Sequence, residues 1–539
     1  MKKLAALILA LLVCMTAVAS AEVTVSDPGV MPIVTEPLTL TVWCPSSNDA
    51  PDFETNTMTL EYEKLTGIHI DWVVEPNNEA TTKLNLEIAG KSYRDIYTGV
   101  GFSTDQVLMC IEGGVFRPLN EFIDNGDMPN FKARLEENPN IREWLTAPDG
   151  NIYTLYITDV GVHMRSQNKM FVYEPWLKAY KDAGFESPRT TEEFRDMLQF
   201  FKDNDMNGNG DNMDEIPLVS SYSAWCGDPL GYLMNPFQLY NANYYTLSDS
   251  KEVQFIANTE GWREGLRYIP SWYEQGLLDE TTYVQDATQL KAVVNKGGEA
   301  EHIVGCVSGA WQGVFVDATT DNWTDYVAVE PLEGPTGLKQ AGASDFSFSL
   351  RCAISTQCEN PRAAAKWLDW WMSDEGVFAN SWGMVEGTDY VYDNDTESFA
   401  GTTPSVVRLQ GMGDGGAIVN YRWGANHAPK HDSYNIRYAA SKDETQYNTN
   451  NTYVLVEAAK PYEPYYVNHN IPPVNWCSDT DLVTEVAEMR TLIGDFISTA
   501  STEFILGVRD IDADWDGYVA ELDNMGLEHY IEILTEYYK

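Results

Sequence analysis

Residues 205–217 constrain this chain most, because they place hard oxygen ligands at the spacing of a calcium-binding loop. Gly210 stands at the sixth position, where such a loop turns sharply enough to favour glycine. We predict a structural Ca²⁺ site with six ligands: Asp205, Asn207, Asn209, Asp211 (through its carbonyl oxygen), Asp214 and Glu215. Glu215 falls one residue before the closing glutamate of an EF-hand, so we do not expect a helix-loop-helix switch. The alternative is an Asx-rich and glycine-rich surface turn without metal.

The residues on either side of this loop predict a helix before it and a strand after it. Thr190 and Glu193 have the spacing of a capping box. Apolar residues then recur at helical spacing, at Phe194, Met197, Leu198 and Phe201. Residues 216–219, Ile-Pro-Leu-Val, have the composition of a short buried strand. The loop is therefore expected between an amphipathic helix and a strand.

Strands and helices alternate along the first part of the chain. We predict strands at residues 38–43, 68–74 and 95–97, with helices around 61–65 and 83–89. Such alternation is typical of a parallel sheet with helices on both faces. The chain is long enough to bury more than one core, so we expect two lobes.

The helix, loop and following strand resemble the extracellular solute-binding proteins of ABC importers, especially the large oligosaccharide-binding kind. In that family a similar Asn-Gly-Asn-Gly segment ending in Asp-Glu-Ile-Pro follows the same helix. The closing segments 503–507, 514–518 and 525–530 also resemble the family, and the resemblance covers the whole mature chain. It implies an α/β, two-lobed periplasmic-binding-protein-like (Venus flytrap) fold, in which each lobe is a mainly parallel sheet flanked by helices.

The resemblance also implies a discontinuous domain organisation. Lobe 1 is expected at residues 38–163 and 332–385, and lobe 2 at 164–331 and 386–539. The chain would cross between the lobes at the boundaries of these segments. Polar side chains in the first crossing would then face the space between the lobes.

The amino terminus predicts export. Two lysines precede a short apolar run, and Ala21 ends a small-x-small cleavage site, so residues 1–21 are expected to be a signal peptide. Residues 22–37 are polar and proline-bearing, which predicts a tether. Cys14 offers a lipid anchor as the alternative, but Val13 occupies a position where a lipobox has glycine or alanine. We therefore expect a protein secreted to the exterior of the cell envelope.

The charge of the chain restricts its partners. Cleavage removes two lysines from 35 basic and 81 acidic residues, which leaves a net charge of −48. This field disfavours nucleic acid and anionic lipid surfaces. Anionic solutes are disfavoured as well, unless a local basic patch or bound calcium offsets the field. A neutral solute is expected.

Aromatic residues are abundant, with 16 Trp and 30 Tyr, and flat rings either fill cores or stack on sugars. Candidate ligand contacts come from strand ends, from the first crossing and from an aromatic and amide-rich run near residue 425: Trp43, His163, Arg165, Trp225, Trp311, Trp423 and Asn426. Trp311 is similar in position to the tryptophan of the Gly-Pro-Trp segment in maltose-type binding proteins. Its alternative role is that of a rim or core aromatic.

Two functions compete. As a binding protein, the chain would act as a monomer that captures an oligosaccharide or related neutral solute and presents it to an ABC permease. As a secreted glycoside hydrolase, it would need two carboxylates at a fixed separation. The sequence contains no nucleophile elbow, His-Glu-x-x-His zinc motif or phosphate-binding loop. The family resemblance favours the binding protein, which is not an enzyme.

Overall fold

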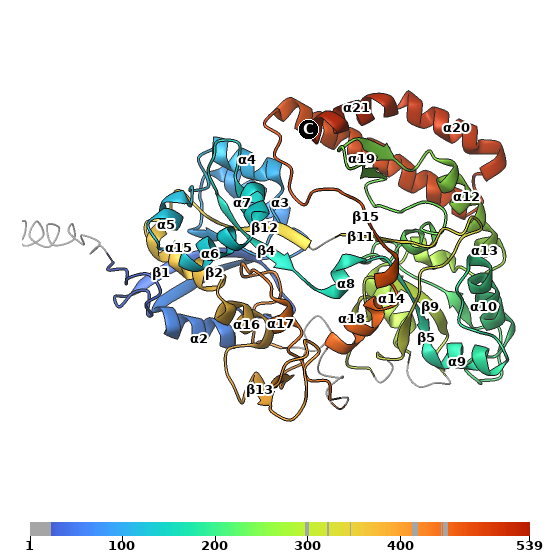
Figure 1. The fold of residues 1–539 in the computed structure, drawn as a ribbon, viewed down its shortest axis with the longest axis horizontal. Helices are drawn as coiled ribbons and strands as arrows, with labels where there is room; N and C mark the ends of the chain where they lie inside the picture. The colour runs from blue at the N-terminus through green and yellow to red at the C-terminus, as the bar shows by residue number, and fades with distance from the viewer. Residues whose placement is uncertain are drawn as a thin grey trace, which may run out of the picture.

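The computed structural model describes residues 23–296, 301–320, 323–344, 347–411, 419–443, 445 and 451–539. The expected signal peptide, residues 1–21, and Cys14 lie outside the described residues. Among the helices described, none combines the length and apolar composition that a membrane span requires. The chain forms two lobes, which lie side by side in Figure 1.

The first lobe is built on a five-stranded sheet in the order β2-β1-β3-β12-β4. Its strands are β1 (Leu38–Pro45), β2 (Ile68–Glu75), β3 (Ile96–Tyr97), β4 (Thr154–Asp159) and β12 (Ser347–Ile354). Strands β1, β2 and β3 are parallel, and β12 pairs antiparallel with both β3 and β4. Four of the five strands therefore point the same way, as a mainly parallel sheet requires.

Helices cover both faces of this sheet (Figure 1). They are α2 (Thr57–Thr66), α3 (Ala80–Gly90), α4 (Thr104–Glu112), α5 (Asn120–Asp124), α6 (Pro129–Glu137), α7 (Pro139–Leu145), α15 (Pro361–Trp370), α16 (Asp374–Trp382) and α17 (Tyr434–Arg437). A small hairpin of β13 (Tyr390–Asp393) and β14 (Ser405–Arg408) packs beside α16.

The second lobe contains a four-stranded sheet in the order β10-β5-β9-β6. Its strands are β5 (Lys169–Tyr173), β6 (Ile216–Leu218), β9 (Val304–Gly309) and β10 (Tyr326–Val329), with β5 antiparallel to the other three. Smaller pairs are β7 (Tyr245–Leu247) with β8 (Val253–Phe255), and β11 (Ala341–Ala343) with β15 (Tyr466–Asn468).

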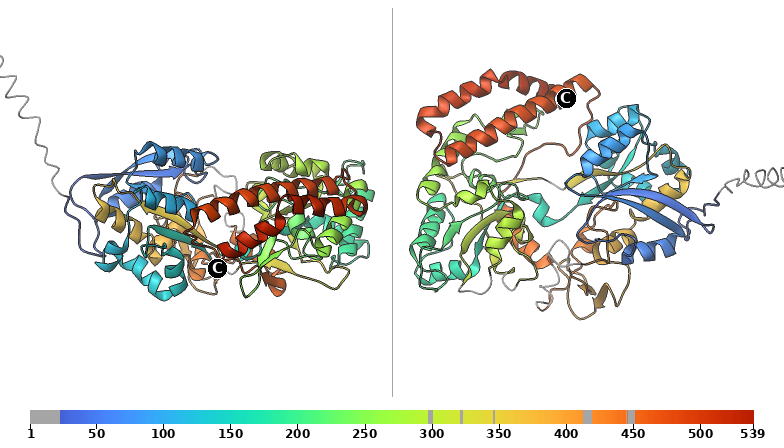
Figure 2. Two further views of the ribbon diagram at one scale, coloured as in Figure 1. Left: turned by 90° about the horizontal axis from the view of Figure 1, so that it is seen from above. Right: turned by 180° about the vertical axis from the view of Figure 1, so that it is seen from behind.

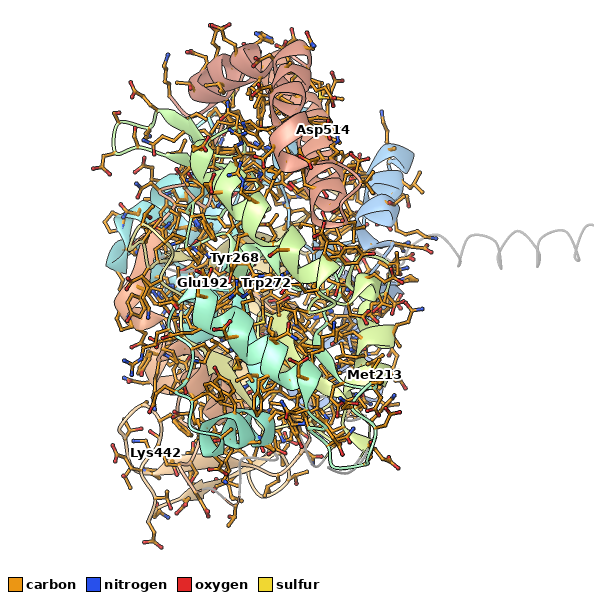
Figure 3. The ribbon with its side chains drawn as sticks, turned by 90° about the vertical axis from the view of Figure 1, so that its right-hand side faces the viewer. Glu192, Met213, Tyr268, Trp272, Lys442 and Asp514 are labelled. Atoms are coloured by element: carbon orange, nitrogen blue, oxygen red, sulfur yellow. The ribbon has the colours of Figure 1, made fainter. Side chains whose placement is uncertain are left out.

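The helices of the second lobe include three at the carboxyl terminus that lie together over one side of the lobe (Figure 2). The full set is α9 (Glu174–Asp182), α10 (Thr191–Asp203), α11 (Leu230–Leu233), α12 (Glu260–Tyr268), α13 (Pro270–Glu274), α14 (Ala287–Val294), α18 (Thr452–Ala459), α19 (Thr480–Ile505), α20 (Ile511–Asn524) and α21 (Leu527–Tyr537). Tyr268 and Trp272, whose ring centroids are 4.7 Å apart, lie between α10 and this region (Figure 3).

The predicted capping box at the start of α10 is confirmed. The backbone N–H of Glu193 donates to Thr190 Oγ1 at 3.2 Å, and the Glu193 carboxylate accepts from the Thr190 N–H at 3.1 Å. Each bond satisfies an amide that would otherwise lack a partner in the first turn. The predicted apolar face, from Phe194 to Phe201, is buried in the second-lobe core.

The observed lobe boundaries differ from the expected ones because of side-chain packing. Leu332 and Ala341 belong to the second-lobe core, so the chain returns to the first lobe just before β12 rather than at residue 332. Trp423 and Ala428 belong to the first-lobe core, although residues 386–539 were expected in the second lobe. The chain re-enters the second lobe only at α18, which contacts α8 (Val162–Arg165) and β10.

Two terminal segments also differ from expectation. Residues 23–34, predicted as part of a tether, pack on the first lobe: Ile33 and Val34 are buried, and Lys366 Nζ donates to Ser26 O at 2.5 Å. Between β15 and α19 the chain touches the first lobe again, where Trp476 Nε1 donates to Trp144 O at 2.8 Å.

A cluster of buried aromatic rings holds the first lobe together around Trp423. Its ring centroid lies 4.7 Å from that of Trp371 and 5.1 Å from that of Trp72. Its Nε1 donates to Thr59 Oγ1 at 2.8 Å. Because Trp423 is fully buried, this irregular segment is fixed to the core as firmly as a regular element.

We expect Trp423→Ala to lower the free energy of unfolding of the first lobe by about 3–5 kcal/mol. The substitution leaves a cavity among four aromatic rings, those of Tyr62, Trp72, Trp367 and Trp371. Urea denaturation followed by tryptophan fluorescence measures the loss. The matched control is Trp225→Ala, since the Trp225 side chain is 44% exposed and its removal should change stability by less than about 1 kcal/mol. Equal losses in the two variants would contradict the core role of Trp423.

Candidate functional site

The two sheets face each other with their strand ends. Strand β4 ends at Asp159, and the chain then enters the second lobe through α8. Because β1 and β3 run in the same direction as β4, their carboxyl ends lie at the same edge of the sheet. Open α/β sheets bind ligands at this edge.

The second lobe presents the corresponding edge. Strand β5 begins at Lys169, which pairs with Gly309 at the end of β9. Strand β6 runs parallel to β9, so the chain after β6 and the chain after β9 both emerge toward the first lobe. These two loops carry Trp225 and Trp311. The arrangement places the candidate site between the lobes, where the strand ends of both sheets meet.

A segment of residues 422–432 forms part of the first-lobe wall by crossing the ends of its strands. His427 Nε2 donates to Pro45 O at 2.8 Å, at the end of β1, and Thr98 Oγ1 donates to His427 O after β3. Lys430 N donates to Tyr156 O on β4 at 3.0 Å. Asn426 lies exposed on this segment, as a ligand-contacting amide must.

Two of the candidate ligand contacts are wrong. Trp43 and Trp423 are both fully buried in the first-lobe core, so neither ring is accessible to a solute. Trp43 lies on β1 with its ring centroid 6.2 Å from that of Tyr97. The sequence placed it next to the strand-end loop, but its own side chain points into the core.

Trp311 is mainly a core residue. It is 8% exposed and belongs to the second-lobe core. Its ring packs against Gly313, where a Cβ atom would lie 2.2 Å from the nearest ring carbon. Glycine is therefore required at position 313, and the core alternative describes Trp311 better than stacking does.

The structure brings His163, Arg165 and Trp225 into one region beside the crossing, the connection from β4 to β5 at residues 160–168. Trp225 Nε1 donates to Gln167 Oε1 at 3.1 Å, and the edge of its ring meets His163 with centroids 6.4 Å apart. Arg165 is exposed and its guanidinium carbon lies 5.1 Å from the ring centroid of Tyr466. The exposed face of Trp225 is available to a ligand.

Burial and neighbouring charges shift the pKa values of two side chains at the base of the crossing, His163 and Asp159. Burial lowers the pKa of His163 to about 3, against the opposing effect of Asp159, so this imidazole is neutral at neutral pH. Burial would raise the pKa of Asp159, but the positive charges of Arg437 and Lys430 hold it below its usual value. The crossing therefore combines a neutral histidine with an ionised carboxylate.

A pocket of about 590 Å³ lies between the lobes next to this region. Its lining combines two aromatic side chains with amides, hydroxyls and single charges; the side chains used below are Trp144, Gln167, Asp249, Phe348, Asn468 and Asn470. Sequence reasoning missed all of them except Gln167, which fell in the predicted crossing segment. Nothing in the sequence around Trp144 or Phe348 distinguishes a pocket aromatic from a core aromatic.

The predicted calcium loop forms a tight turn around its own carboxylates. Gly210 has φ +91°, in the left-handed region that glycine tolerates. Asp205 accepts hydrogen bonds from the backbone N–H groups of Gly208 and Gly210, at 2.7 and 2.8 Å. Asn209 Oδ1 accepts from Asp211 N at 2.7 Å. Met213, 85% exposed, lies on the outer surface (Figure 3).

The polar atoms of this loop fit a hard cation. Asp214 Oδ1 and Glu215 Oε2 are buried without a hydrogen-bond partner among the described residues. Among all the residues that the structure describes, no group of three His, Cys, Asp or Glu side chains is arranged to hold a metal ion. Calcium differs from transition metals because it also accepts amide and backbone carbonyl oxygens. Asn207, Asn209 and the Asp211 carbonyl oxygen can supply these.

A family model and several relatives match this chain. The model described as bacterial extracellular solute-binding protein matches residues 57–385. The fructooligosaccharide ABC transporter substrate-binding protein FusA of Streptococcus pneumoniae is 28% identical over 497 residues, which cover 88% of this chain and 85% of FusA.

Solved structures show the same fold. FusA in complex with kestose, and a FusA EF-hand mutant in complex with fructo-nystose, give TM-scores of 0.76 and 0.75 at 24% identity, covering 93% of this chain and 98% of each. An HMO-binding, ABC-transporter-associated solute-binding protein from Bifidobacterium longum infantis gives a TM-score of 0.74 at 17% identity, covering 94% of this chain and 99% of that one. The expected two-lobed α/β fold is confirmed.

The buried imidazole of His427 predicts a pH-dependent stability. Burial lowers its pKa to about 4, so below pH about 6.5 the unfolded chain binds a proton that the folded chain does not. Lowering the pH from about 7.5 to about 5.5 should therefore remove about 1.4 kcal/mol of unfolding free energy through this group. In His427→Gln the side chain can still donate to Pro45 O, but it does not titrate. This variant therefore loses no unfolding free energy through position 427 as the pH falls.

We therefore expect the stability gap between wild type and His427→Gln to shrink by about 1.4 kcal/mol as the pH falls over this range. Urea denaturation of both proteins at the two pH values measures the gap, and other titrating groups cancel in the difference. A gap that stays constant would show that His427 has an ordinary pKa.

Proposed function

Because this chain belongs to the bacterial extracellular solute-binding protein family, we propose that it is the substrate-binding component of an ABC importer and captures an oligosaccharide between its lobes. The observation that carries the proposal is the pair of facing sheet edges, with an exposed tryptophan and an aromatic- and amide-lined pocket between them. A ligand that contacts both lobes stabilises the closed state by its differential contacts.

The lining of the pocket between the lobes supports a sugar as the ligand. Trp144 and Phe348 offer flat apolar faces, which suit the C–H faces of a pyranose or furanose ring. Gln167, Asn468 and Asn470 offer both donors and acceptors for hydroxyl groups. A volume of about 590 Å³ falls within the usual range for small-molecule sites. The similarity to FusA makes fructo-oligosaccharides the first probes to test.

We assign the ligand contacts to both lobes. On the side of the second lobe and the crossing they are Trp225, Gln167 and Arg165, and on the first lobe they include Asn426. His163, a predicted contact, is only 5% exposed, so its ring supports the crossing from below and does not contact the solute. Trp225 contributes a stacking face, Gln167 fixes its orientation through the indole N–H, and Asn426 offers an amide from the opposite wall. The protein would act as a monomer outside the cell membrane and deliver the closed complex to its permease.

The proposal excludes catalysis. A glycoside hydrolase needs two carboxylates flanking the scissile bond. Asp249 is the sole acidic side chain among the described residues that line the pocket of about 590 Å³ between the lobes. The family is one of binding proteins, which gives the hydrolase hypothesis no support.

We also propose that residues 205–215 hold a structural Ca²⁺ ion, and the EF-hand of FusA is consistent with such a site in a relative. The side chains of Asp205, Asn207, Asn209, Asp214 and Glu215 and the carbonyl group of Asp211 would hold it. The ion would neutralise carboxylates that converge in one loop, two of which have buried oxygens without a partner among the described residues. Its role would be to brace the connection between α10 and β6.

Trp225→Ala is expected to weaken oligosaccharide binding about tenfold, equivalent to about 1.4 kcal/mol, because a stacking face is lost. Isothermal titration with kestose and longer fructo-oligosaccharides measures the change, and chromatography of the ligand afterwards should recover it intact. Phe185→Ala is the control, since Phe185 is 47% exposed and lies away from the crossing. Shortened sugar in the recovered ligand would instead indicate the hydrolase.

Removal of calcium should lower the melting temperature of the second lobe by several degrees. A bound ion at about 100 times its Kd stabilises the folded state by about 2.7 kcal/mol. Calorimetry with and without a chelator tests this, and Asp205→Asn should lower both the melting temperature and its sensitivity to the chelator. Asp203→Asn, just outside the loop, should behave as wild type. A melting temperature that ignores the chelator would rule the ion out.

A further inference from the structure

We infer that the tip of the β7–β8 hairpin, residues 248–251, determines which sugar the protein accepts, because Asp249 binds two adjacent hydroxyl groups of the guest and Lys251 binds a further oxygen. The inference rests on the proposed solute-binding function. Ser248, Asp249 and Lys251 all line the pocket of about 590 Å³ between the lobes. Asp249 and Lys251 are the charged side chains among the described residues of this lining, one of each sign, so the lining itself does not select a charged guest.

The hairpin tip is held in one conformation by its own hydrogen bonds. Ser248 N donates to Glu252 O at 2.9 Å, and Lys251 N donates to Ser248 O at 2.9 Å. The Ser248 hydroxyl oxygen accepts from Glu252 N at 3.0 Å and lies 2.9 Å from Ser250 Oγ. A binding group on a loop that is already ordered loses less conformational freedom when the guest binds.

The hairpin is also fastened to the segment that forms the neighbouring wall of the pocket. Leu247 N donates to His469 O at 3.0 Å, and Asn470 Nδ2 donates to Leu247 O at 3.1 Å. Asn470 itself lines the pocket. At the base of the hairpin, the hydroxyl groups of Tyr245 and Tyr538 are 2.8 Å apart, which joins β7 to the end of α21. These contacts fix the position of the tip within the second lobe.

Lys251 has a backbone conformation that glycine would adopt at lower cost. Its φ is +62°, in the left-handed region where other residues are uncommon. It is the last residue of a three-residue hairpin loop, the position at which a left-handed residue closes such a loop. A lysine there accepts backbone strain and places a long cationic side chain at the pocket. Strained residues of this kind cluster at ligand-binding sites.

The charged groups of the tip are available to a guest. Asp249 Oδ1 accepts from Asn470 Nδ2 at 3.5 Å, at the long limit for a hydrogen bond, and its side chain makes no other hydrogen bond with the described residues. Lys251 Nζ forms no hydrogen bond or ion pair within the same part of the chain. A carboxylate accepts through both oxygens, which complements two adjacent hydroxyl donors. Such charge-assisted hydrogen bonds are about twice as strong as neutral ones.

The opposite wall of the pocket is apolar and belongs to the first lobe. Trp144 on α7 and Phe348 on β12 lie edge to face, with ring centroids 5.3 Å apart. A sugar ring carries C–H groups on its faces and hydroxyl groups around its rim, so one unit can place a face against these rings while its rim reaches the hairpin tip. Recognition of the rim then favours the closed state, because the same unit contacts both lobes. The preferred guest is therefore a neutral sugar with a free vicinal diol at this unit.

The test uses a neutral oligosaccharide and analogues that each lack one of its hydroxyl groups. Isothermal titration of the full mature chain with kestose, nystose and maltotriose selects the sugar that binds most tightly. Analogues lacking either of two adjacent hydroxyl groups should bind wild type at least about tenfold more weakly than the intact sugar, because a carboxylate oxygen is left without its donor. In Asp249→Asn the same analogues should lose less than about threefold, since that carboxylate is already absent.

Analogues that lose as much affinity in Asp249→Asn as in wild type overturn the inference but leave the proposed function standing. A wild-type protein that binds none of the three sugars overturns the proposed function, and the inference with it.

Variants test the location of the site. Asp249→Asn should weaken binding of the intact sugar by at least about tenfold, and Lys251→Asn should act in the same direction. Asparagine tolerates the left-handed backbone of position 251, and both side chains are exposed, so the melting temperature should change little.

The matched control is Glu252→Gln, which removes an exposed carboxylate from the same hairpin. Glu252 does not line the pocket, so this variant should bind the sugar as wild type does. An equal loss of affinity in Glu252→Gln and Asp249→Asn, or no loss in either, overturns the assignment.

Discussion

Two open sheets that meet at their strand ends set the architecture of this protein. A parallel strand pair leaves its carboxyl ends uncovered, and the loops that follow them carry polar groups without the constraints of the ladder. Here β4 and α8 lead directly from one such edge to the other. The same crossing that joins the lobes therefore brings together His163, Trp225 and Gln167, and connectivity and site geometry have a single origin.

Buried charge accompanies this arrangement. His163 lies beneath the crossing as a neutral ring, while Asp159 stays ionised because Arg437 and Lys430 lie close to it. Lys169, at the start of β5, is fully buried, and burial lowers its pKa to about 7. Each of these groups is fixed by hydrogen bonds or neighbouring charges, as buried polar groups must be. The first-lobe wall gains its order from the same kind of contact, through His427 and Lys430.

Local sequence rules predicted much of the fold because they depend on neighbours in the chain. The capping box at Thr190 and the helical spacing from Phe194 to Phe201 are examples. The candidate site was predicted less well, since side-chain direction depends on distant packing. Trp43 was placed correctly on a strand, yet its ring is buried in the core. Trp423 lies in an irregular segment, where no helical or strand periodicity indicates which side chains are buried. The predicted return to the second lobe at residue 386 was wrong for the same reason, because it depends on packing between distant segments.

The hydrogen bond from Trp476 to the Trp144 carbonyl has a mechanical consequence. The segment between β15 and α19 leaves the second lobe, is fastened to the first, and returns to the second as a long helix. Rotation that parts the lobes must either stretch this strap or release the indole from its carbonyl partner. This segment therefore limits how far the two lobes can open while that hydrogen bond stays intact.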